Sequence, residues 1–233
     1  MTLLEIINRA CTRAKMPYIQ SVEDSSSSQA REYLEYANQA NEFILDYWDW
    51  RALARDVRII TEEQQKRICL PPDFGGFLVN QIYDRTRNLW LQNADDDVSL
   101  QNRAGKYMTD IPFWRVVGNS IEFDFPLAKG RELLLAYKSK WAVVRKNAWT
   151  PTVELFSKDT DTYILSDKAL VAGILYEKSA SYNDSDVDIT KARFLDILAE
   201  LKEKDGAKRK INIYGRGANR ISPTDFQPYE PLI

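Results

Sequence analysis

The periodicity of apolar residues changes twice along this chain, and that order limits the folds open to it. Residues 3–15 and 29–51 repeat apolar side chains at steps of three and four, as amphipathic helices do. Residues 55–148 instead hold short strand-like runs separated by turn residues, and the helical period returns at 167–181 and 187–204. The sequence therefore predicts an α+β fold in which an antiparallel β-domain is inserted into a helical bundle.

The first helix is predicted by its capping residues as well as by its period. Thr2 stands three residues before Glu5, the spacing of a capping box, in which each side chain satisfies the backbone N–H of the other residue. Pro17 ends the segment, because the residue before a proline disfavours the helical conformation. A polar, serine-rich loop at 21–28 separates this helix from the next.

The second helix, expected over residues 29–51, carries two apolar stripes. The main stripe ends at Trp48, which we expect in the core. A second stripe, Tyr36, Phe43 and Trp50, lies about 100° away around the helix axis. The opposite face is acidic, which disfavours a platform for stacking nucleic-acid bases. Since a helix with two apolar stripes needs more than one partner surface, we expect Tyr36, Phe43 and Trp50 at a contact with another subunit or another partner.

The middle of the chain predicts one small antiparallel sheet of about five or six strands. Its clearest part is a hairpin at residues 113–125, where Gly118 and Asn119 form a two-residue turn with glycine first, as a type II′ turn requires. Residues 94–105 predict a short helix. The other strand-like runs are 57–60, 67–70, 77–84, 88–91 and 131–141.

Four parts of the chain follow from these patterns. Residues 1–54 form the N-terminal helical part of the bundle, and 55–148 form the inserted antiparallel β-domain. Residues 149–206 form an extended segment and a helical hairpin that completes the bundle. Residues 207–233 form an extended, basic C-terminal arm.

The arm has no sustained period, yet it spaces basic and aromatic side chains along its length. A pure spacer has no need of apolar side chains, so we expect the arm to dock on a partner; a flexible tail is the alternative interpretation. The residues expected at this contact are Lys208, Arg209, Lys210, Tyr214, Arg216, Arg220, Phe226 and Tyr229.

The composition argues against most catalytic chemistry. The chain has no histidine, which excludes Ser-His-Asp and Cys-His catalysis and imidazole metal sites, and its two cysteines make neither a disulfide framework nor a zinc site. A metal-dependent hydrolase built on Asp95–Asp97 and Asp184–Asp188 is the remaining enzyme hypothesis. The second cluster lacks the glycine and the glutamate of an EF-hand loop, which favours a turn before a helix. We expect no enzyme, no metal and no cofactor.

Charge and hydropathy set the expected location. A net charge of −2 gives no overall attraction to DNA or to membranes. No apolar run is long enough to span a bilayer, and the first residues lack the basic region and cleavage site of a signal peptide. With two thiols only, synthesis in a reducing cytoplasm is expected.

The order of elements and short motifs resembles the head-to-tail adaptor proteins of short-tailed bacteriophages, the tail tubular protein A group. The similar parts are "MTLLEII" at the start, a long helix ending in "WDWRAL", then "LPPDF", "YDRTRNLWL", a hairpin and "DTDTYILSDKAL". They span roughly residues 1–205. Proteins of that group combine a helical bundle with an inserted β-domain and assemble as a twelve-fold ring between the portal and the tail nozzle.

This resemblance implies a structural virion protein, synthesised in the host cytoplasm. Its partners would be further copies of itself in a dodecamer, the portal protein and the tail nozzle protein. Genome DNA would only pass through the channel during ejection, and no membrane would be involved. The alternative is a cytosolic regulatory or nucleic-acid-binding module that acts through the basic C-terminal arm.

Overall fold

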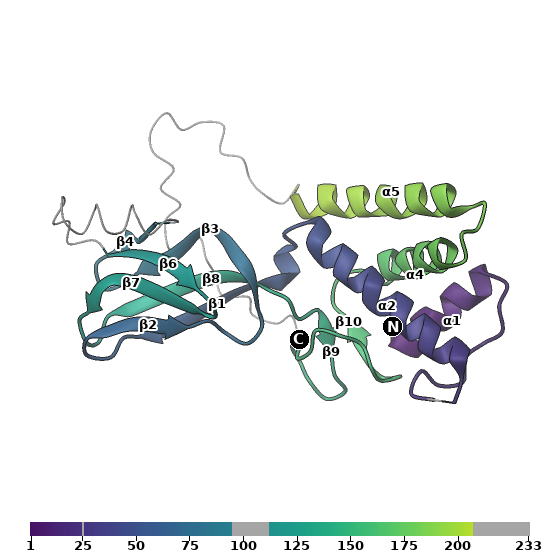
Figure 1. Cartoon of the computed structure of the whole chain (residues 1–233), viewed down its shortest axis with the longest axis horizontal. Helices are drawn as coiled ribbons and strands as arrows, with labels where there is room; N and C mark the ends of the chain where they lie inside the picture. Colours follow the sequence, from purple (N-terminus) through teal and green to yellow (C-terminus); the bar gives the residue numbers. More distant parts are fainter. Residues whose placement is uncertain (25, 95–111, 207–233) are drawn as a thin grey trace.

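The computed structural model of the chain describes residues 1–24, 26–94 and 112–206. Four α-helices lie within them: α1 (Leu3–Arg13), α2 (Ser28–Tyr47), α4 (Asp167–Ser181) and α5 (Val187–Gly206). Figure 1 shows these helices gathered at one end of the molecule, the helical lobe, and most strands at the other end, the β-lobe. The expected α+β class is confirmed. The short helix predicted at 94–105 and the arm at 207–233 lie outside the described ranges, apart from Ala94.

The helix starts follow their capping residues. Thr2 Oγ1 accepts the backbone N–H of Glu5, and Glu5 Oε2 accepts that of Thr2, so the predicted capping box is confirmed. Ser27 caps α2 and Ser166 caps α4, each by accepting the N–H three residues on. These bonds satisfy N–H groups that the first helical turn leaves without an internal partner.

The end of α2 differs from the prediction. The helix stops at Tyr47, and Trp48 is extended, with φ −156° and ψ 155°. The last carbonyls of α2 are instead satisfied by side chains: Trp50 Nε1 donates to Ile44 O at 2.6 Å, and Lys138 Nζ donates to Leu45 O at 2.8 Å. Trp48 and Trp50 therefore do not continue the two helical stripes, and that part of the prediction is wrong.

The β-lobe contains two four-stranded sheets rather than the single sheet predicted. The first has the order β1-β8-β3-β4 and is antiparallel throughout; the second has the order β2-β7-β6-β5, in which only β5 and β6 are parallel. The bounds are β1 Ala54–Ile60, β2 Gln65–Cys69, β3 Phe74–Asp84, β4 Leu89–Trp90, β5 Gln92–Asn93, β6 Phe113–Val117, β7 Ser120–Leu127 and β8 Glu132–Ser139.

Both sheets contribute side chains to one core. Ile121 and Phe123 on β7 alternate with more exposed residues, and they share a buried cluster with Leu133 and Leu135 on β8. Trp114 of β6 is the largest fully buried side chain of this cluster. Alternation of this kind is what two sheets packed face to face require. The hairpin predicted at 113–125 is confirmed, with Gly118 at φ +60° in its two-residue turn.

A second core lies in the helical lobe and contains residues from all four helices. It also takes in Ala142 and Val143, which the sequence placed with the β-domain, and Phe156 and Tyr163 from the segment before α4. A two-stranded sheet of β9 (Val143–Val144) and β10 (Thr162–Tyr163) holds this segment. The chain passes from one lobe to the other at the short 3-10 helix η1 (Arg51–Leu53) and again after β8 (Figure 1).

A glycine sets the spacing of the helices. A Cβ atom on Gly173 of α4 would lie 2.7 Å from Ala40 Cβ of α2 and 3.1 Å from Phe194 Cζ of α5. Glycine at this position therefore lets α4 approach both neighbours closely. Within the described ranges, no helix combines the length and the hydropathy that crossing a membrane requires.

Candidate interaction surface

The structure separates the three aromatic residues that the sequence assigned to an interface. Tyr36 and Trp50 are 7% and 6% exposed and belong to the helical core, whereas Phe43 is 36% exposed. The Phe43 ring lies 5.2 Å from that of Phe194, so α5 covers part of the stripe. Of the three, Phe43 alone keeps substantial surface for a partner.

Most of the other candidates from the sequence lie outside the residues that the structure describes. Lys208, Arg209, Lys210, Tyr214, Arg216, Arg220, Phe226 and Tyr229 lie outside the described residues, as do Asp95–Asp97. Asp184–Asp188 includes the turn before α5, where the backbone N–H of Val187 donates to Asp184 O. No group of three or more His, Cys, Asp or Glu residues that could hold a metal ion is found in residues 1–24, 26–94 and 112–206.

A cavity of about 620 Å³ opens where the ends of α2 and α5 meet η1 and the segment before α4. Most of its lining is apolar, and the polar side chains are at the α5 end and at Ser166. The lining residues are Ile44, Trp50, Ala52, Ile164, Leu165, Ser166, Leu201, Lys204 and Asp205. Its size and lining match those of sites that bind an apolar group.

Asp205 connects this cavity to the end of α2. Its Oδ2 accepts the indole N–H of Trp48 at 3.2 Å and the backbone N–H of Arg51 at 3.3 Å. Lys202 Nζ lies 4.2 Å from the centre of the Trp48 ring, a cation–π contact on the same turn. No local pattern marks Asp205 in the sequence, because its hydrogen-bond partners lie more than 150 residues away in the chain.

Lys204, which lines the cavity, belongs to a charge cluster on α4 and α5. Lys204 and Lys168 both donate to the carboxylate of Glu200, at 2.6 and 3.1 Å. These hydrogen bonds lower the pKa of Glu200, with that from Lys204 contributing most. The carboxylate therefore stays ionised to lower pH than an isolated glutamate would.

The segment before α4 fastens the N-terminal residues through two aspartates. Asp159 accepts Ser21 Oγ and the backbone N–H of Val22, both at 2.7 Å. Asp161 is fully buried; its side chain accepts the backbone N–H groups of Ser157 and Lys158 at 2.9 Å, and its backbone O accepts the N–H of Leu3 at 2.7 Å. The "DTDTY" motif is thus a structural junction.

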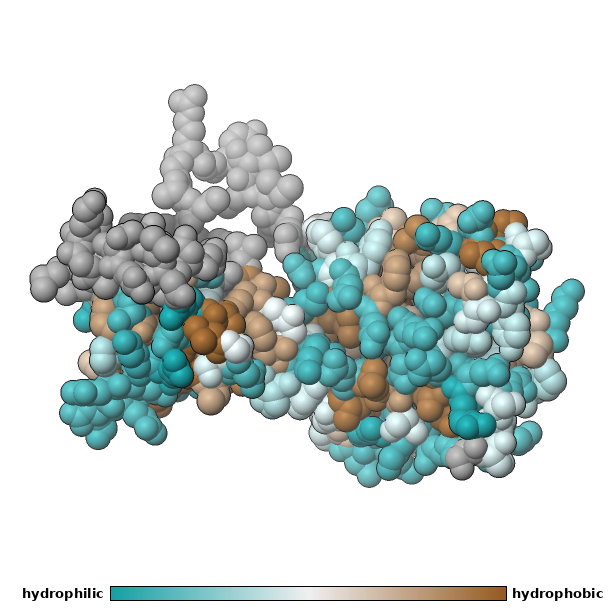
Figure 2. All heavy atoms as spheres, in the orientation of Figure 1, coloured by the Kyte–Doolittle hydropathy of each residue, from teal (hydrophilic) through white to brown (hydrophobic). Residues whose placement is uncertain are grey.

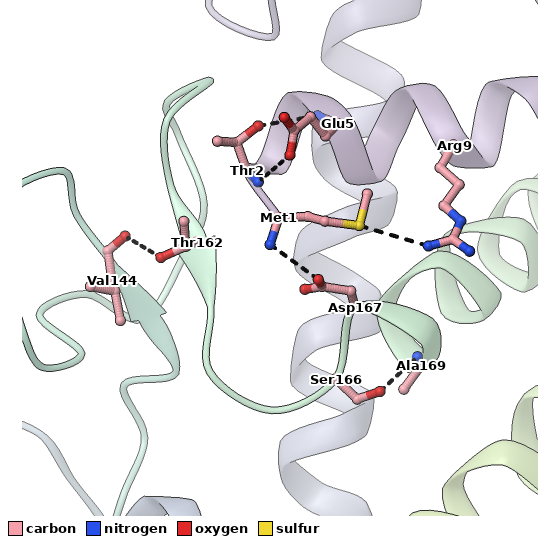
Figure 3. Close-up of polar contacts among 9 residues, drawn as sticks. All are labelled: Met1, Thr2, Glu5, Arg9, Val144, Thr162, Ser166, Asp167 and Ala169. Carbon is pink, nitrogen blue, oxygen red and sulfur yellow. Dashed lines mark hydrogen bonds and ion pairs between the residues drawn. The ribbon is translucent and has the colours of Figure 1, made fainter. Parts of the chain in front are cut away.

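Figure 3 shows the neighbouring junction at the start of the chain. The amino group of Met1 donates to Asp167 Oδ2 at 3.1 Å, beside the capping box of α1 and the Ser166 cap of α4. Thr2 also forms an isolated β-bridge with Thr162. The first residues, β10 and α4 are therefore held together at one place.

Large apolar side chains remain exposed on both lobes, and Figure 2 shows hydrophobic surface between hydrophilic groups on the visible face of each. On the β-lobe they are Ile60, Val116 and Val117; on the helical lobe they include Tyr18, Trp149, Tyr182 and Ile189. Scattered apolar residues are normal on a surface, but tryptophan is enriched among the residues that carry most of the binding energy at interfaces. No family model matches the chain, and no curated protein matches it.

Proposed function

We propose that this chain is a structural virion protein, a ring-forming head-to-tail adaptor that joins the portal to the tail nozzle of a short-tailed phage and continues the DNA channel. In this proposal the four described helices act as the bundle, and the β-lobe is the insertion. The role is exercised by surfaces rather than by catalysis, so it needs neither a metal nor a cofactor.

One observation carries the proposal: the motifs on which the resemblance rests coincide with the junctions of the structure. "WDWRAL" covers the end of α2 and η1, where the chain leaves the helical lobe. In "LPPDF", Asp73 accepts the hydroxyl of Tyr137 at 2.9 Å and the backbone N–H of Lys140 at 2.8 Å. "DTDTY" holds the N-terminal residues through the bonds of Val22 to Asp159 and of Leu3 to Asp161. The resemblance thus concerns residues that fix the architecture.

A second, weaker support comes from the surface. A subunit of a ring has at least two contact faces toward its neighbours and further faces toward the partners above and below. The exposed large apolar residues of this chain are spread over both lobes, and the arm at 207–233 adds spaced aromatic and basic side chains. A chain with several separate contact faces suits a connector better than it suits a protein with a single binding cleft.

The proposal is tested by adding the purified full chain to purified portal rings and separating free from bound chain by gradient sedimentation. We expect the chain to sediment with the portal, and to lose this binding when residues 207–233 are removed. A chain that stays free of the portal at high concentration would contradict the adaptor role.

The same samples test the alternative role. A nucleic-acid-binding module would bind duplex DNA at physiological salt, and the variant with alanine at Lys208, Arg209 and Lys210 would lose that binding. Contacts to phosphates weaken steeply with salt, so we expect the adaptor to show only weak, salt-sensitive DNA binding. Tight DNA binding that depends on the three residues would favour the alternative.

A further inference from the structure

One side chain of the helical lobe is left almost wholly in solvent. Trp149 is 99% exposed and lies in the loop between β9 and β10. The loop is held by a turn, in which the backbone N–H of Ala148 donates to Arg145 O at 3.0 Å, and by Asn147 in the left-handed region at φ +70°. Because the indole ring is large and mostly apolar, its burial at a contact would be favourable in free energy, and the isolated chain does not gain that energy.

The same chain has a cavity of matching chemistry at another place. The cavity at the end of α2 and α5 is lined mainly by Ile44, Trp50, Leu165 and Leu201, and no residue of the Trp149 loop lines it. Its volume of about 620 Å³ exceeds that of an indole ring. At one side, Asp205 Oδ1 accepts no hydrogen bond within the part of the chain that the structure describes, whereas Oδ2 accepts two.

We propose that Trp149 of one copy of this chain inserts into this cavity of a second copy. Buried tryptophan side chains require an acceptor for the indole N–H, and Asp205 Oδ1 can provide one. Lys146 is exposed and precedes Trp149 by three residues. Its positive charge would be attracted to the negative charge of Asp205. The cavity thus has room for the indole ring, a mainly apolar lining to bury it and a carboxylate oxygen to accept its N–H.

The geometry makes this contact head-to-tail. Trp149 and the cavity are different surfaces of one chain. After two copies have joined, one copy still has a free Trp149 and the other a free cavity, so further copies can bind at both ends. In Figure 1 the connection between β9 and β10 lies on the side of the helical lobe away from α5. The inference deepens the proposed function and rests on it for ring closure, because the contact alone permits either a ring or an open filament.

The contact is weak when it acts alone. An aromatic side chain buries about 150–250 Å², far below the 1,200–2,000 Å² or so that a stable interface buries in total. A portal ring that holds copies side by side would raise their effective concentration and favour the contact. The experiment must therefore capture a transient contact and not depend on a stable dimer.

Disulfide trapping meets this need. The background is Cys69→Ser, which removes the exposed native thiol, while Cys11 is buried. In this background, Thr150→Cys places a thiol beside Trp149, and Ala52→Cys places a second thiol at the cavity. Under mild oxidation of the full chain at high concentration, we expect a ladder of dimers, trimers and larger species. Adding Trp149→Ala should reduce the ladder at least about tenfold, the scale of losing a hot-spot tryptophan.

The matched control is Tyr18→Ala, which removes another exposed aromatic ring of the helical lobe and should leave the ladder unchanged. Thermal unfolding of each variant before oxidation checks that it is folded. A ladder equally strong with Trp149→Ala, no ladder at all, or products that stop at the dimer would each overturn the proposal. If trapping appears only after residues 207–233 are removed, the arm occupies the cavity and the proposal is wrong.

The outcome separates this contact from the adaptor role. A ladder that depends on Trp149, from a chain that does not bind portal rings, would uphold the contact and contradict the adaptor. Portal binding without the ladder would uphold the adaptor and overturn the contact.

Discussion

Single residues fix the β-lobe by charge as well as by burial. Glu122 on β7 lies opposite Arg67 of β2 and Arg115 of β6, so one carboxylate bridges three neighbouring strands. Arg115 Nη2 lies 2.7 Å from Glu122 Oε2, and Arg67 Nη2 lies 3.0 Å from Oε1. The hydrogen bonds from Arg115 and then Arg67 lower the pKa of Glu122.

We predict that Glu122→Gln lowers the free energy of unfolding by about 1 kcal/mol at pH 7, the upper end for exposed ion pairs and cross-strand pairs. A carboxylate with a lowered folded-state pKa stabilises the fold above its unfolded pKa, near 4.3, and this stability is lost as pH falls through the folded pKa. Urea unfolding at pH 7, 5 and 3 should show the difference shrinking at pH 3. Glu63→Gln, an exposed site on the same lobe, is the control. A difference that is independent of pH would contradict the assignment.

The two tryptophans after α2 differ in what they contribute. Trp50 is 6% exposed and donates to Ile44 O, whereas Trp48 is half-buried and contacts Asp205 and Lys202. We predict that Trp50→Ala costs about 3–5 kcal/mol, as emptying a buried aromatic site does, and that Trp48→Ala costs clearly less. Chemical denaturation of both variants measures this. A larger loss for Trp48→Ala would contradict the core position of Trp50.

At the scale of elements, the sequence predicts helices better than it predicts their ends. The periods of α1, α2, α4 and α5 are local, and so is the capping box at Thr2, which makes both visible in the sequence. The end of α2 depends on Lys138 and Asp205, which are brought to it from distant parts of the chain. No local pattern marks such partners, and the helix was therefore predicted four residues too long.

The strands show the same limit. Each strand-like run can be recognised from its own residues, and the hairpin has a recognisable two-residue turn at Gly118 and Asn119. Which strands share a sheet is set by long-range pairing, such as that of Ala54 with Lys138 between β1 and β8. A list of strand-like runs does not contain this pairing, so two sheets were predicted as one.

Gly173 offers a test of how the helices pack. Alanine is the better helix former by about 1 kcal/mol, yet its Cβ would meet Ala40 Cβ at 2.7 Å. We predict that Gly173→Ala nevertheless destabilises the fold by about 1–3 kcal/mol through overpacking, and that adding Ala40→Gly recovers part of this loss. Thermal unfolding of the single and double variants gives the comparison. A stabilising Gly173→Ala would show that α4 does not approach α2 this closely.

At the scale of the whole molecule, the sequence pointed to surplus aromatic surface but placed it wrongly. Tyr36 and Trp50 are buried in the helical core, and Phe43 is partly covered by Phe194 of α5, a helix that follows α2 by about 140 residues in the sequence. Trp149 and the cavity beside Asp205 had no recognisable motif. Exposure is a property of the folded chain, so a single exposed tryptophan and a cavity built from four segments become visible only in three dimensions.

The two separate cores give the molecule two lobes, each with exposed apolar side chains. We interpret this arrangement as that of a connector whose lobes face different partners. Such a connector assembles as a ring on the portal, so the number of chain copies bound to each portal ring is the property to measure.

Native mass spectrometry of portal rings saturated with the full chain provides that number. We predict one complete ring of chain copies for each portal, with few partly filled species, because neighbouring copies stabilise one another. Portal rings that bind no chain, or that bind it in scattered, independent numbers without completing a ring, would contradict the claim that this protein is a ring-forming adaptor.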